Sequence, residues 1–352
     1  MHWQPVHLYA LSPATLYLTI KMKNQIKTTL LTLSGIFTTA VQAELTEVTF
    51  GTNWVAQAEH GGFYQSIADG TYEQCGLNVT IVPGGPQVNN RALLLAGKLD
   101  YHMGTDMLPA FNAVQQGIPV VSVAAMFQKD PLVLISHPGK AKSFSDLSDM
   151  QLLISDGDFH TWYQWAIAAH NFSAENRLNY TFNPAPFLAD ENIGMQGYLT
   201  SEPYLVEQEG GFKPEIFLLA DAGYSNYSTT IETMADTIDN KPEEVKCFVD
   251  GSIKGWYNYL HNDNRAADAL IMKDNPEMTP NKIEYAIDKM ISEGIVISGD
   301  ATTKGIGVIT ETKVTDFFQK MVAAGILEAD LNYKSAFSTA FTGNGVGMEL
   351  IK

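Results

Sequence analysis

The sequence has few basic side chains and few cysteines, and these shortages narrow what the protein can be. Its 352 residues contain 22 lysines and arginines against 39 aspartates and glutamates, which gives a formal net charge of -17 at pH 7. Such an acidic surface repels nucleic acid and anionic membranes, so neither is expected as a partner. After about residue 44, no segment has the roughly eighteen uninterrupted apolar residues that a membrane-spanning helix needs.

Motifs for metal binding, nucleophilic catalysis and nucleotide binding are also missing. The eight histidines form no H-x-H, H-x-x-x-H or H-E-x-x-H spacing, and no G-x-S-x-G, Walker or Rossmann glycine pattern occurs. His60 and His160 are therefore expected to be isolated polar side chains. We predict no metal and no cofactor.

The two cysteines form no C-x-x-C or metal-site spacing. Cys75 precedes a predicted strand, and Cys247 opens a predicted helix near the C-terminus. Two separate thiols are the simpler expectation. A disulfide is the alternative, and it would require an oxidising compartment and both cysteines in one lobe.

The first 43 residues have the pattern of an export signal. From Met22 onward, lysines precede an apolar stretch from Leu30 to Val41, and Val-Gln-Ala ending at Ala43 supplies the small residues that signal peptidase requires. We predict a signal peptide over 1–43, with Met22 as the better start, and an exported mature chain. The roughly 300 residues that follow are enough for two domains.

Apolar, β-branched stretches alternate with helical patterns along most of the chain, which predicts an α/β protein. Strands are expected at 48–50, 78–82, 99–103, 119–126, 132–136, 151–155, 178–182, 195–199 and 216–219. Helices are expected at 62–72, 88–96, 107–115 and 159–170, and then at 242–261, 265–274, 280–292 and 310–324.

Two extended segments, near 130–136 and 223–231, are expected to join two lobes. Residues 44–131 and 230–352 would form the first lobe, and residues 132–229 the second. A layout with two crossings makes a hinge.

Three predicted strand ends bring polar, aromatic and glycine residues to one edge of a sheet. N-W-V-A-Q-A-E-H-G-G-F-Y begins at Asn53, P-G-G-P begins at Pro83, and G-T-D begins at Gly104. Open α/β sheets bind ligands beyond the carboxyl ends of their strands, so we expect a binding crevice there.

These segments, together with Q-G-Y-L-T-S-E-P-Y at 196–204, resemble the periplasmic solute-binding proteins of nitrate, sulfonate, taurine and thiamine-precursor ABC importers. The resemblance extends from about Leu45 to the C-terminus. It implies an α/β, two-lobed type II periplasmic binding protein fold with a hinge between two mixed, mostly parallel sheets. It also implies a periplasmic location, a small-molecule ligand and an inner-membrane ABC permease as partner. We expect a monomer.

The same family includes thiamine-pyrimidine synthases, which use a C-C-C-F-C motif and a lysine and a histidine after the third strand. Here those two positions fall on Asp106 and Ala110, and the chain has only two cysteines. The resemblance therefore implies binding and not catalysis.

Side chains at the predicted strand ends are the candidate ligand contacts. Aromatic faces from both lobes can stack on a flat ligand, and a carboxylate can accept hydrogen bonds from its nitrogen edge. Glu202 is the carboxylate that the resemblance favours, and a first-turn helix residue is its alternative role. Phe63, Trp165 and Tyr198 are expected to pack inside a lobe. The candidates are Asn53, Trp54, His60, Tyr64, Gly84, Gly85, Gly104 and Thr105 in the first lobe, Asp158, Trp162 and Glu202 in the second, and Tyr224.

The charges at the predicted mouth favour a neutral or cationic ligand. Glu59, Asp106, Asp156 and Asp158 lie on these loops, whereas the nearest arginine, Arg91, is on a helix. Such a mouth repels small anions. We therefore predict a thiamine-type pyrimidine precursor or a similar flat nitrogen heterocycle. Taurine or another sulfonate is the alternative, because the glycine turns could offer backbone amides to an anion.

Overall fold

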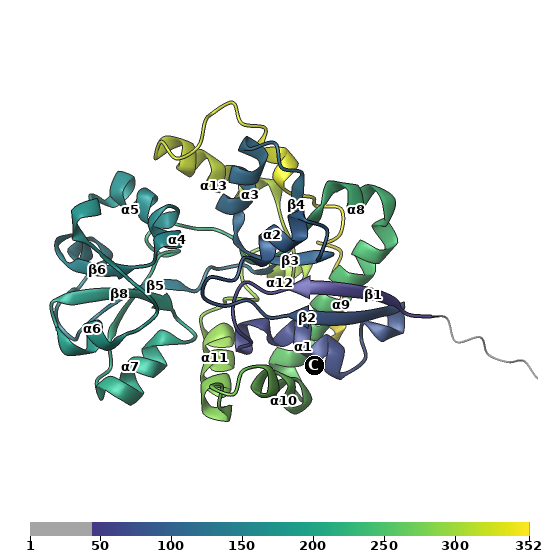
Figure 1. Cartoon of the computed structure of the whole chain (residues 1–352), viewed down its shortest axis with the longest axis horizontal. Helices are drawn as coiled ribbons and strands as arrows, with labels where there is room; N and C mark the ends of the chain where they lie inside the picture. The colour runs from purple at the N-terminus through teal and green to yellow at the C-terminus, as the bar shows by residue number, and fades with distance from the viewer. Residues whose placement is uncertain (1–43, 352) are drawn as a thin grey trace, which may run out of the picture. The chain divides into compact units, whose positions relative to one another are not determined.

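The computed structural model describes residues 44–351, so the predicted export signal over 1–43 lies outside the described residues. Two five-stranded sheets form the cores of two lobes (Figure 1). The second lobe is the teal group at the left of that view, and the first lobe combines the purple and blue segments with the green and yellow ones. No helix within residues 44–351 is both long and apolar enough to cross a bilayer.

The first sheet has the strand order β2-β1-β3-β10-β4. Its strands are β1 (Thr46–Gly51), β2 (Leu77–Val82), β3 (Tyr101–Asp106), β4 (Val120–Phe127) and β10 (Ser228–Met234). β1 runs parallel to β2 and β3, whereas β10 runs antiparallel to β3 and β4. β10 is the strand that returns from the second lobe, and it lies between β3 and β4.

Helices pack on both faces of the first sheet, as expected where parallel strands are joined by crossovers. They are α1 (Gly61–Ala68), α2 (Asn90–Leu95), α3 (Met107–Gln115), α8 (Ala235–Asn240), α9 (Pro242–His261), α10 (Arg265–Asp274), α11 (Pro280–Ser292), α12 (Ala301–Lys304) and α13 (Glu311–Ala323). Phe50 of β1 shows how the core forms, because its ring packs against Phe63 of α1 and Phe248 of α9.

The second sheet has the order β7-β6-β8-β5-β9. Its strands are β5 (Leu132–Ser136), β6 (Gln151–Ile154), β7 (Arg177–Asn179), β8 (Ile193–Tyr198) and β9 (Glu215–Leu218), and its helices are α4 (Asp156–Phe159), α5 (Trp162–His170), α6 (Ala185–Ala189) and α7 (Glu202–Gly210). β5 runs antiparallel to β8 and β9, while β6 runs parallel to β7 and β8. In each sheet four strands therefore run in one direction and one strand, β10 or β5, runs in the other, which confirms the prediction of two mixed, mostly parallel sheets.

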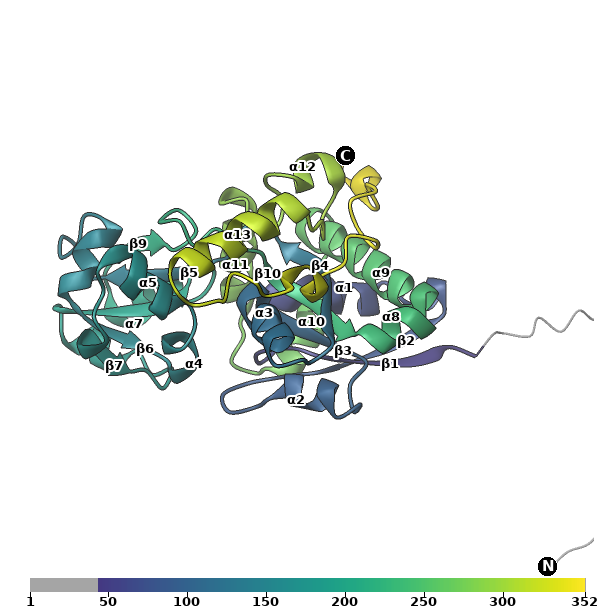
Figure 2. The ribbon, with the colours of Figure 1, turned by 90° about the horizontal axis from the view of Figure 1, so that it is seen from above.

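The chain passes between the sheets twice, at 128–131 and 219–227. An ion pair of 2.9 Å between Lys129 and Asp221 joins the two crossings. Seen from above, α13 lies beside this region (Figure 2), and Phe317 of α13 packs edge-on against Tyr224 of the second crossing at 5.1 Å between ring centroids.

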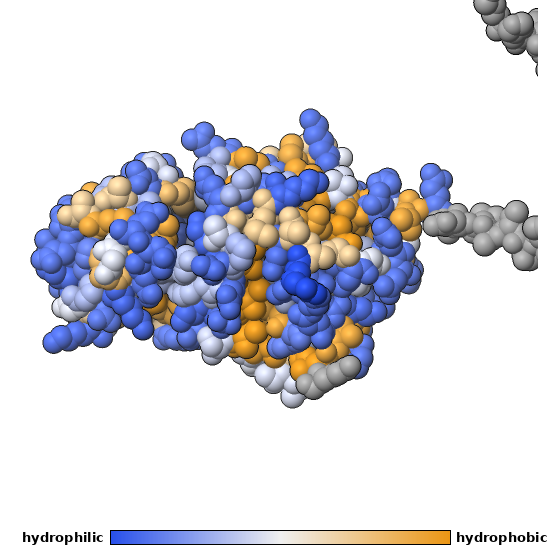
Figure 3. Space-filling view, turned by 90° about the horizontal axis from the view of Figure 1, so that it is seen from below, coloured by the Kyte–Doolittle hydropathy of each residue, from blue (hydrophilic) through white to orange (hydrophobic). Residues whose placement is uncertain are grey.

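Hydropathy differs between the lobes on the face seen from below. Hydrophilic residues dominate the second lobe there, whereas apolar residues gather over the first lobe (Figure 3). A groove of about 420 Å³ in the first lobe lies between α10 and α11 and is lined in part by Met272, Ile283 and Ile287.

Cys75 and Cys247 form a disulfide, so the expectation of two separate thiols was wrong. Cys75 ends a short 3-10 helix (Glu73–Cys75), and Cys247 lies in the first two turns of α9. Both are in the first lobe, because α9 packs along α1 and brings Gly251 against the ring of Tyr72. The bond closes a sequence separation of 172 residues.

Glycine lets α9 approach α1 closely, and this contact gives a testable prediction. A β-carbon at Gly255 would overlap the hydroxyl of Ser66 and the backbone oxygen of Gly62. Because overpacking a close backbone contact forces helices apart, we expect Gly255→Ala to lower the free energy of unfolding by about 3 kcal/mol. Urea unfolding measures it, with Lys254→Ala on the exposed side of α9 as the control. Equal midpoints for the two variants would contradict this account of the packing.

Candidate functional site

Three aspartates from different parts of the chain come together where the lobes are joined. Asp106 ends β3 and caps α3, accepting a hydrogen bond from the Leu108 amide at 2.6 Å. Asp130 lies in the first crossing and accepts from the Leu132 amide at 3.0 Å. Asp158 comes from α4 of the second lobe. Each lobe and one crossing therefore contribute one carboxylate. We call these three residues the hinge cluster.

Burial and mutual repulsion act on the hinge cluster. Burial raises the pKa of Asp106 to about 7, and the nearby charge of Asp158 adds to the effect. Burial also raises the pKa of Asp130 well above its usual value, and the charges of Asp106 and Asp158 raise it further. Lys313 opposes the shift of Asp130. The three carboxylates are thus close enough to repel one another.

The ends of β6 and β8 hold Asp158 in place. Its Oδ2 accepts hydrogen bonds from the Ser155 hydroxyl at 2.7 Å and from Gln196 Nε2 at 2.5 Å. Gln196 is fixed in turn, because its Oε1 accepts from the Ser155 amide at 2.7 Å. Asp158 therefore has a defined orientation although it is only half-buried.

Aromatic side chains surround the hinge cluster. Burial raises the pKa values of Tyr198 and Tyr224 well above the usual range, and the charges of all three aspartates raise them further. The hydroxyls therefore lie near the carboxylates. Tyr198 is only partly buried, which differs from the expectation that it packs inside a lobe.

Two buried donors beside the cluster, and a third at the start of α5, have no hydrogen-bond partner among residues 44–351. They are the hydroxyl of Tyr224, Nε1 of Trp162 and Nδ2 of Asn226. Asn226 is next to Asp106 and slightly lowers its pKa, but Nδ2 makes no hydrogen bond of ordinary geometry. An unpaired buried donor costs about 1–3 kcal/mol, so this arrangement suits a ligand or water that accepts these bonds.

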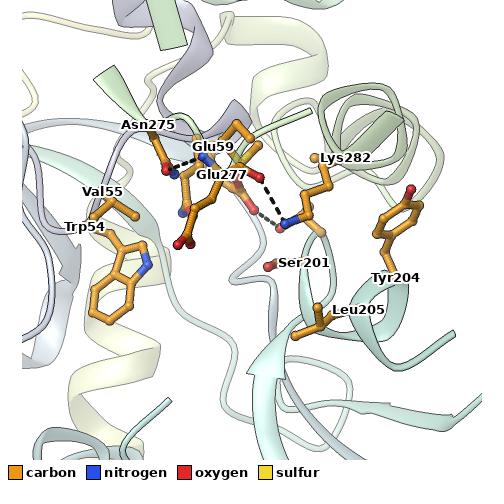
Figure 4. Close-up of a pocket in the computed structure, with 13 residues that line it drawn as sticks. Trp54, Val55, Glu59, Ser201, Tyr204, Leu205, Asn275, Glu277 and Lys282 are labelled. Atoms are coloured by element: carbon orange, nitrogen blue, oxygen red, sulfur yellow. Dashed lines mark hydrogen bonds between the residues drawn. The ribbon is translucent and has the colours of Figure 1, made fainter. Parts of the chain in front are cut away.

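A pocket between the lobes has a volume of about 150 Å³ (Figure 4). Its lining includes Trp54, Val55, Glu59, Thr200, Ser201, Tyr204, Leu205, Asn275, Glu277 and Lys282. In Figure 4, Trp54 lies on one side of the pocket, and Tyr204 and Leu205 of α7 lie on the other. The Trp54 ring also contacts Phe182 of the second lobe, with 4.6 Å between ring centroids.

Glu59 links the two lobes at this pocket. Its Oε1 accepts a hydrogen bond from the Thr200 hydroxyl of the second lobe. Burial raises the pKa of Glu59 to about 7, although the bond from Thr200 acts in the opposite direction. The two lobes are therefore in contact in this structure.

His60 and Tyr64 turn into the first lobe and away from both openings. His60 is fully buried, which lowers its pKa to about 3, and neither ring nitrogen has a partner within residues 44–351. The Tyr64 hydroxyl donates to Asp274 of α10 at 2.9 Å. Tyr64 therefore faces α10, whereas His60 ends a short 3-10 helix (Ala58–His60) that packs against α1 and α11.

The predicted glycines and Glu202 have local structural tasks. Gly84 is pressed against the backbone of residues 52–54 and donates to the Trp54 carbonyl at 3.0 Å. A β-carbon at Gly104 would meet Thr230 and Glu232. The Glu202 carboxylate is buried and accepts from the Tyr198 amide at 2.6 Å, so it caps its own turn.

The remaining candidates differ in exposure, and one acidic residue lies away from the mouth. Asn53 is partly buried, Gly85 is buried in its turn and Thr105 is exposed. Asp156 is 78% exposed and forms an ion pair with Arg177. The charge of Asp156 is therefore balanced by Arg177 at the surface.

Sequence reasoning did not select Asp130 or Asn226. Both lie on the crossings, where no motif marks them; the available signal was an acidic residue followed by proline at 130–131. Within residues 44–351, no three histidine, cysteine, aspartate or glutamate side chains are grouped as metal ligands. The hinge cluster is therefore a set of separate charges and not a preformed metal site.

The family model described as NMT1/THI5 like matches residues 57–266, more than half of the chain. The chain belongs to this family. The match covers β2 to β10 and α1 to α9, and it includes all three aspartates of the hinge cluster. No curated protein sequence matches the chain.

Solved structures share the fold of this NMT1/THI5 like protein at low sequence identity. The alkanesulfonate-binding protein SsuA from Xanthomonas axonopodis pv. citri, bound to MOPS, has a TM-score of 0.60 and 13% identity, over 84% of this chain and 99% of that one. The periplasmic nitrate-binding protein NrtA from Synechocystis PCC 6803 has a TM-score of 0.59 and 12% identity, over 83% of this chain and 85% of that one. The desulfurization enzyme DSZB has a TM-score of 0.53 and 11% identity, over 86% of this chain and 99% of that one. These likenesses establish the two-lobed periplasmic binding protein fold.

Proposed function

We propose that this NMT1/THI5 like protein is an exported solute-binding protein of an ABC importer. It captures a small flat nitrogen heterocycle, such as a thiamine pyrimidine precursor, between its lobes and presents it to an inner-membrane permease. The observation that carries the proposal is the hinge cluster, in which carboxylates from both lobes and a crossing lie near Tyr198 and Tyr224.

Closure of the lobes follows from where these groups come from. A ligand between Asp106 and Asp158 touches both lobes only when they are closed, so its differential contacts stabilise the closed form. Partly buried Tyr198 and buried Trp162 offer a ring face and an N–H group to a flat ligand. Trp54 and Glu59 then contact the second lobe at the other opening.

A sulfonate is the second candidate ligand, favoured by the printed name of a structural neighbour, SsuA. The charges of the hinge cluster oppose it. Arg91, the cation that could have offset them, is engaged by buried Glu232 at 3.3 Å, and His102 contacts the same carboxylate at 3.1 Å. A small anion would meet net repulsion here.

An enzyme of the synthase type is the alternative from another class, and DSZB shows that this fold also occurs in an enzyme. Asp106, at the position that the synthase resemblance gives to a lysine, caps α3 and belongs to the hinge cluster. A carboxylate cannot form the imine that a lysine would, so we favour binding.

A thermal-shift screen of residues 44–352 tests the function. Aminopyrimidines and related nitrogen heterocycles are expected to raise the melting temperature, because a ligand that binds only the folded protein stabilises it by mass action. Taurine, alkanesulfonates and nitrate are the comparison set, and calorimetry then measures affinity. Stabilisation by sulfonates alone would overturn the proposed ligand class. Turnover of a bound heterocycle would overturn the proposal that the protein is a receptor and not an enzyme.

A further inference from the structure

We propose that the ligand is an organic dication, a molecule with two separated protonated nitrogen groups that both engage the hinge cluster. The inference rests on the proposed function and adds the charge of the ligand to it. It is carried by a surplus of negative charge and by unused hydrogen-bonding atoms between the lobes.

The negative charge of the cluster is only partly balanced. Lys313 of α13 is the cation that acts on Asp130, and its Nζ donates to the Gln128 carbonyl and lies 4.3 Å from the centroid of the Tyr227 ring. When all three carboxylates are ionised they face this one ammonium group, so a ligand with two positive charges would balance them.

Other ionisable groups around the cluster do not supply the missing positive charge. Glu232 also acts on Asp106 but is itself paired with Arg91 and His102. Glu59 acts on Tyr198 from the first lobe and adds negative charge. The remaining neighbours, Tyr198 and Tyr224, are neutral because burial raises the pKa of each.

Each carboxylate of the cluster keeps an oxygen free for a ligand. Asp106 and Asp130 each use Oδ1 for one backbone amide, and Asp158 uses Oδ2 for Ser155 and Gln196. Among residues 44–351, no donor makes a hydrogen bond of ordinary geometry to the second oxygen of any of the three. Nitrogen cations fit these acceptors, because charge-assisted bonds are about twice as strong as neutral ones.

Buried groups beside the cluster independently indicate an organic ligand. The Tyr224 hydroxyl and Trp162 Nε1 are buried and unpaired among the described residues, and their aromatic rings form part of the surroundings. Aromatic faces attract organic cations, so a flat body between two nitrogen groups suits these surroundings. Within residues 44–351 the carboxylates are not grouped as metal ligands, so a molecule that spans them fits better than a metal ion.

Capture of a dication is linked to protons. The free protein holds protons on the cluster near neutral pH, because burial raises the pKa of Asp106 to about 7 and that of Asp130 well above its usual value. The bound cation favours the ionised carboxylates. Binding therefore releases protons, and affinity rises with pH between about 6 and 8, below the range in which amines lose their charge.

Titration calorimetry with matched amines tests the inference. 1,4-Bis(aminomethyl)benzene carries two ammonium groups, benzylamine carries one, and 4-(hydroxymethyl)benzylamine has one group and nearly the length of the diamine. We expect the diamine to bind at least about tenfold more tightly than either monoamine. Titrations at pH 7 in two buffers with different ionisation enthalpies are expected to show proton release.

Variants of the chain make the test specific. Asp130→Asn is expected to remove most of the preference for the diamine while leaving the weaker binding of benzylamine. Asp156→Asn makes the same change of charge on α4 but at an exposed ion pair, and should leave both affinities unchanged. Equal affinities for the diamine and the monoamines, or no binding of the diamine, overturn the inference. If a neutral pyrimidine still binds in that case, the receptor proposal stands; if no solute binds, both fail.

Discussion

Replacement of Asp106 and Asp158 together by asparagine is expected to weaken binding of a cationic cleft ligand by at least about 100-fold. Each carboxylate offers a charge-assisted hydrogen bond of about 1.5–3 kcal/mol, and about 1.4 kcal/mol corresponds to a factor of ten. Asparagine has nearly the same shape and also caps helices well, so the α3 cap at residue 106 should persist. Calorimetry with 1,4-bis(aminomethyl)benzene measures the loss.

The same double variant is expected to be more stable than the natural chain when no ligand is present. The pKa of Asp106 is raised in the folded state to about 7, so its ionised form destabilises the fold above that pH. The gain should therefore be largest above about pH 7 and disappear below about pH 4, where the acid is protonated in both states.

Melting curves between pH 4 and 8 separate this explanation from a merely structural role. A structural role would make the double variant melt at a lower temperature, with affinity lost through unfolding. Asp156→Asn again serves as the control for net charge. A lower melting temperature together with unchanged affinity for the diamine would remove the hinge cluster from the binding site.

Loss of the Cys75–Cys247 disulfide is expected to lower the free energy of unfolding by about 3–5 kcal/mol. The bond closes a separation of 172 residues, and the entropy that it removes from the unfolded chain grows with the length of the closed loop. Cys75→Ser with Cys247→Ser, compared by urea unfolding, measures the effect. The bond joins a short 3-10 helix to α9, so affinity for the cleft ligand should not change.

A reductant supplies the matched control. It should destabilise the natural chain and leave the double serine variant unchanged. Equal stability of the oxidised natural chain and the variant would show that native strain or residual structure in the unfolded chain offsets the cross-link.

Much of the fold was predictable because the helices carry strong local signals. The bounds of α3, α9, α10 and α11 match the expected ranges, and Pro242 and Pro280 mark two of the helix starts. The antiparallel direction of β5 and β10 was not predictable, because it follows from the way the chain crosses between the lobes and not from local periodicity. The expectation of two separate thiols was wrong for the same reason, because the disulfide depends on how α9 packs.

The residue types of the candidate site were predictable from the sequence, but their positions in space were less so. Reasoning from strand ends selected Asp158, which the structure places near Asp106 and Asp130, and its role in ligand binding stays a prediction. His60 and Tyr64 stand in the same stretch of sequence as Trp54 but point into the lobe. Their four-residue spacing puts them on one side of the first turns, and packing against α9 and α10 decides which way that side faces.

Asp130 and Tyr224 lie on the two connections between the lobes, which form the hinge in the closure proposed above. Points near an axis of rotation travel least, so in that closure these groups would keep nearly the same separation. A ligand can therefore bind at the hinge before the two lobes come into contact. The pairs Trp54–Phe182 and Glu59–Thr200 lie farther from the hinge. In such a closure they would be the last contacts to form and the first to break.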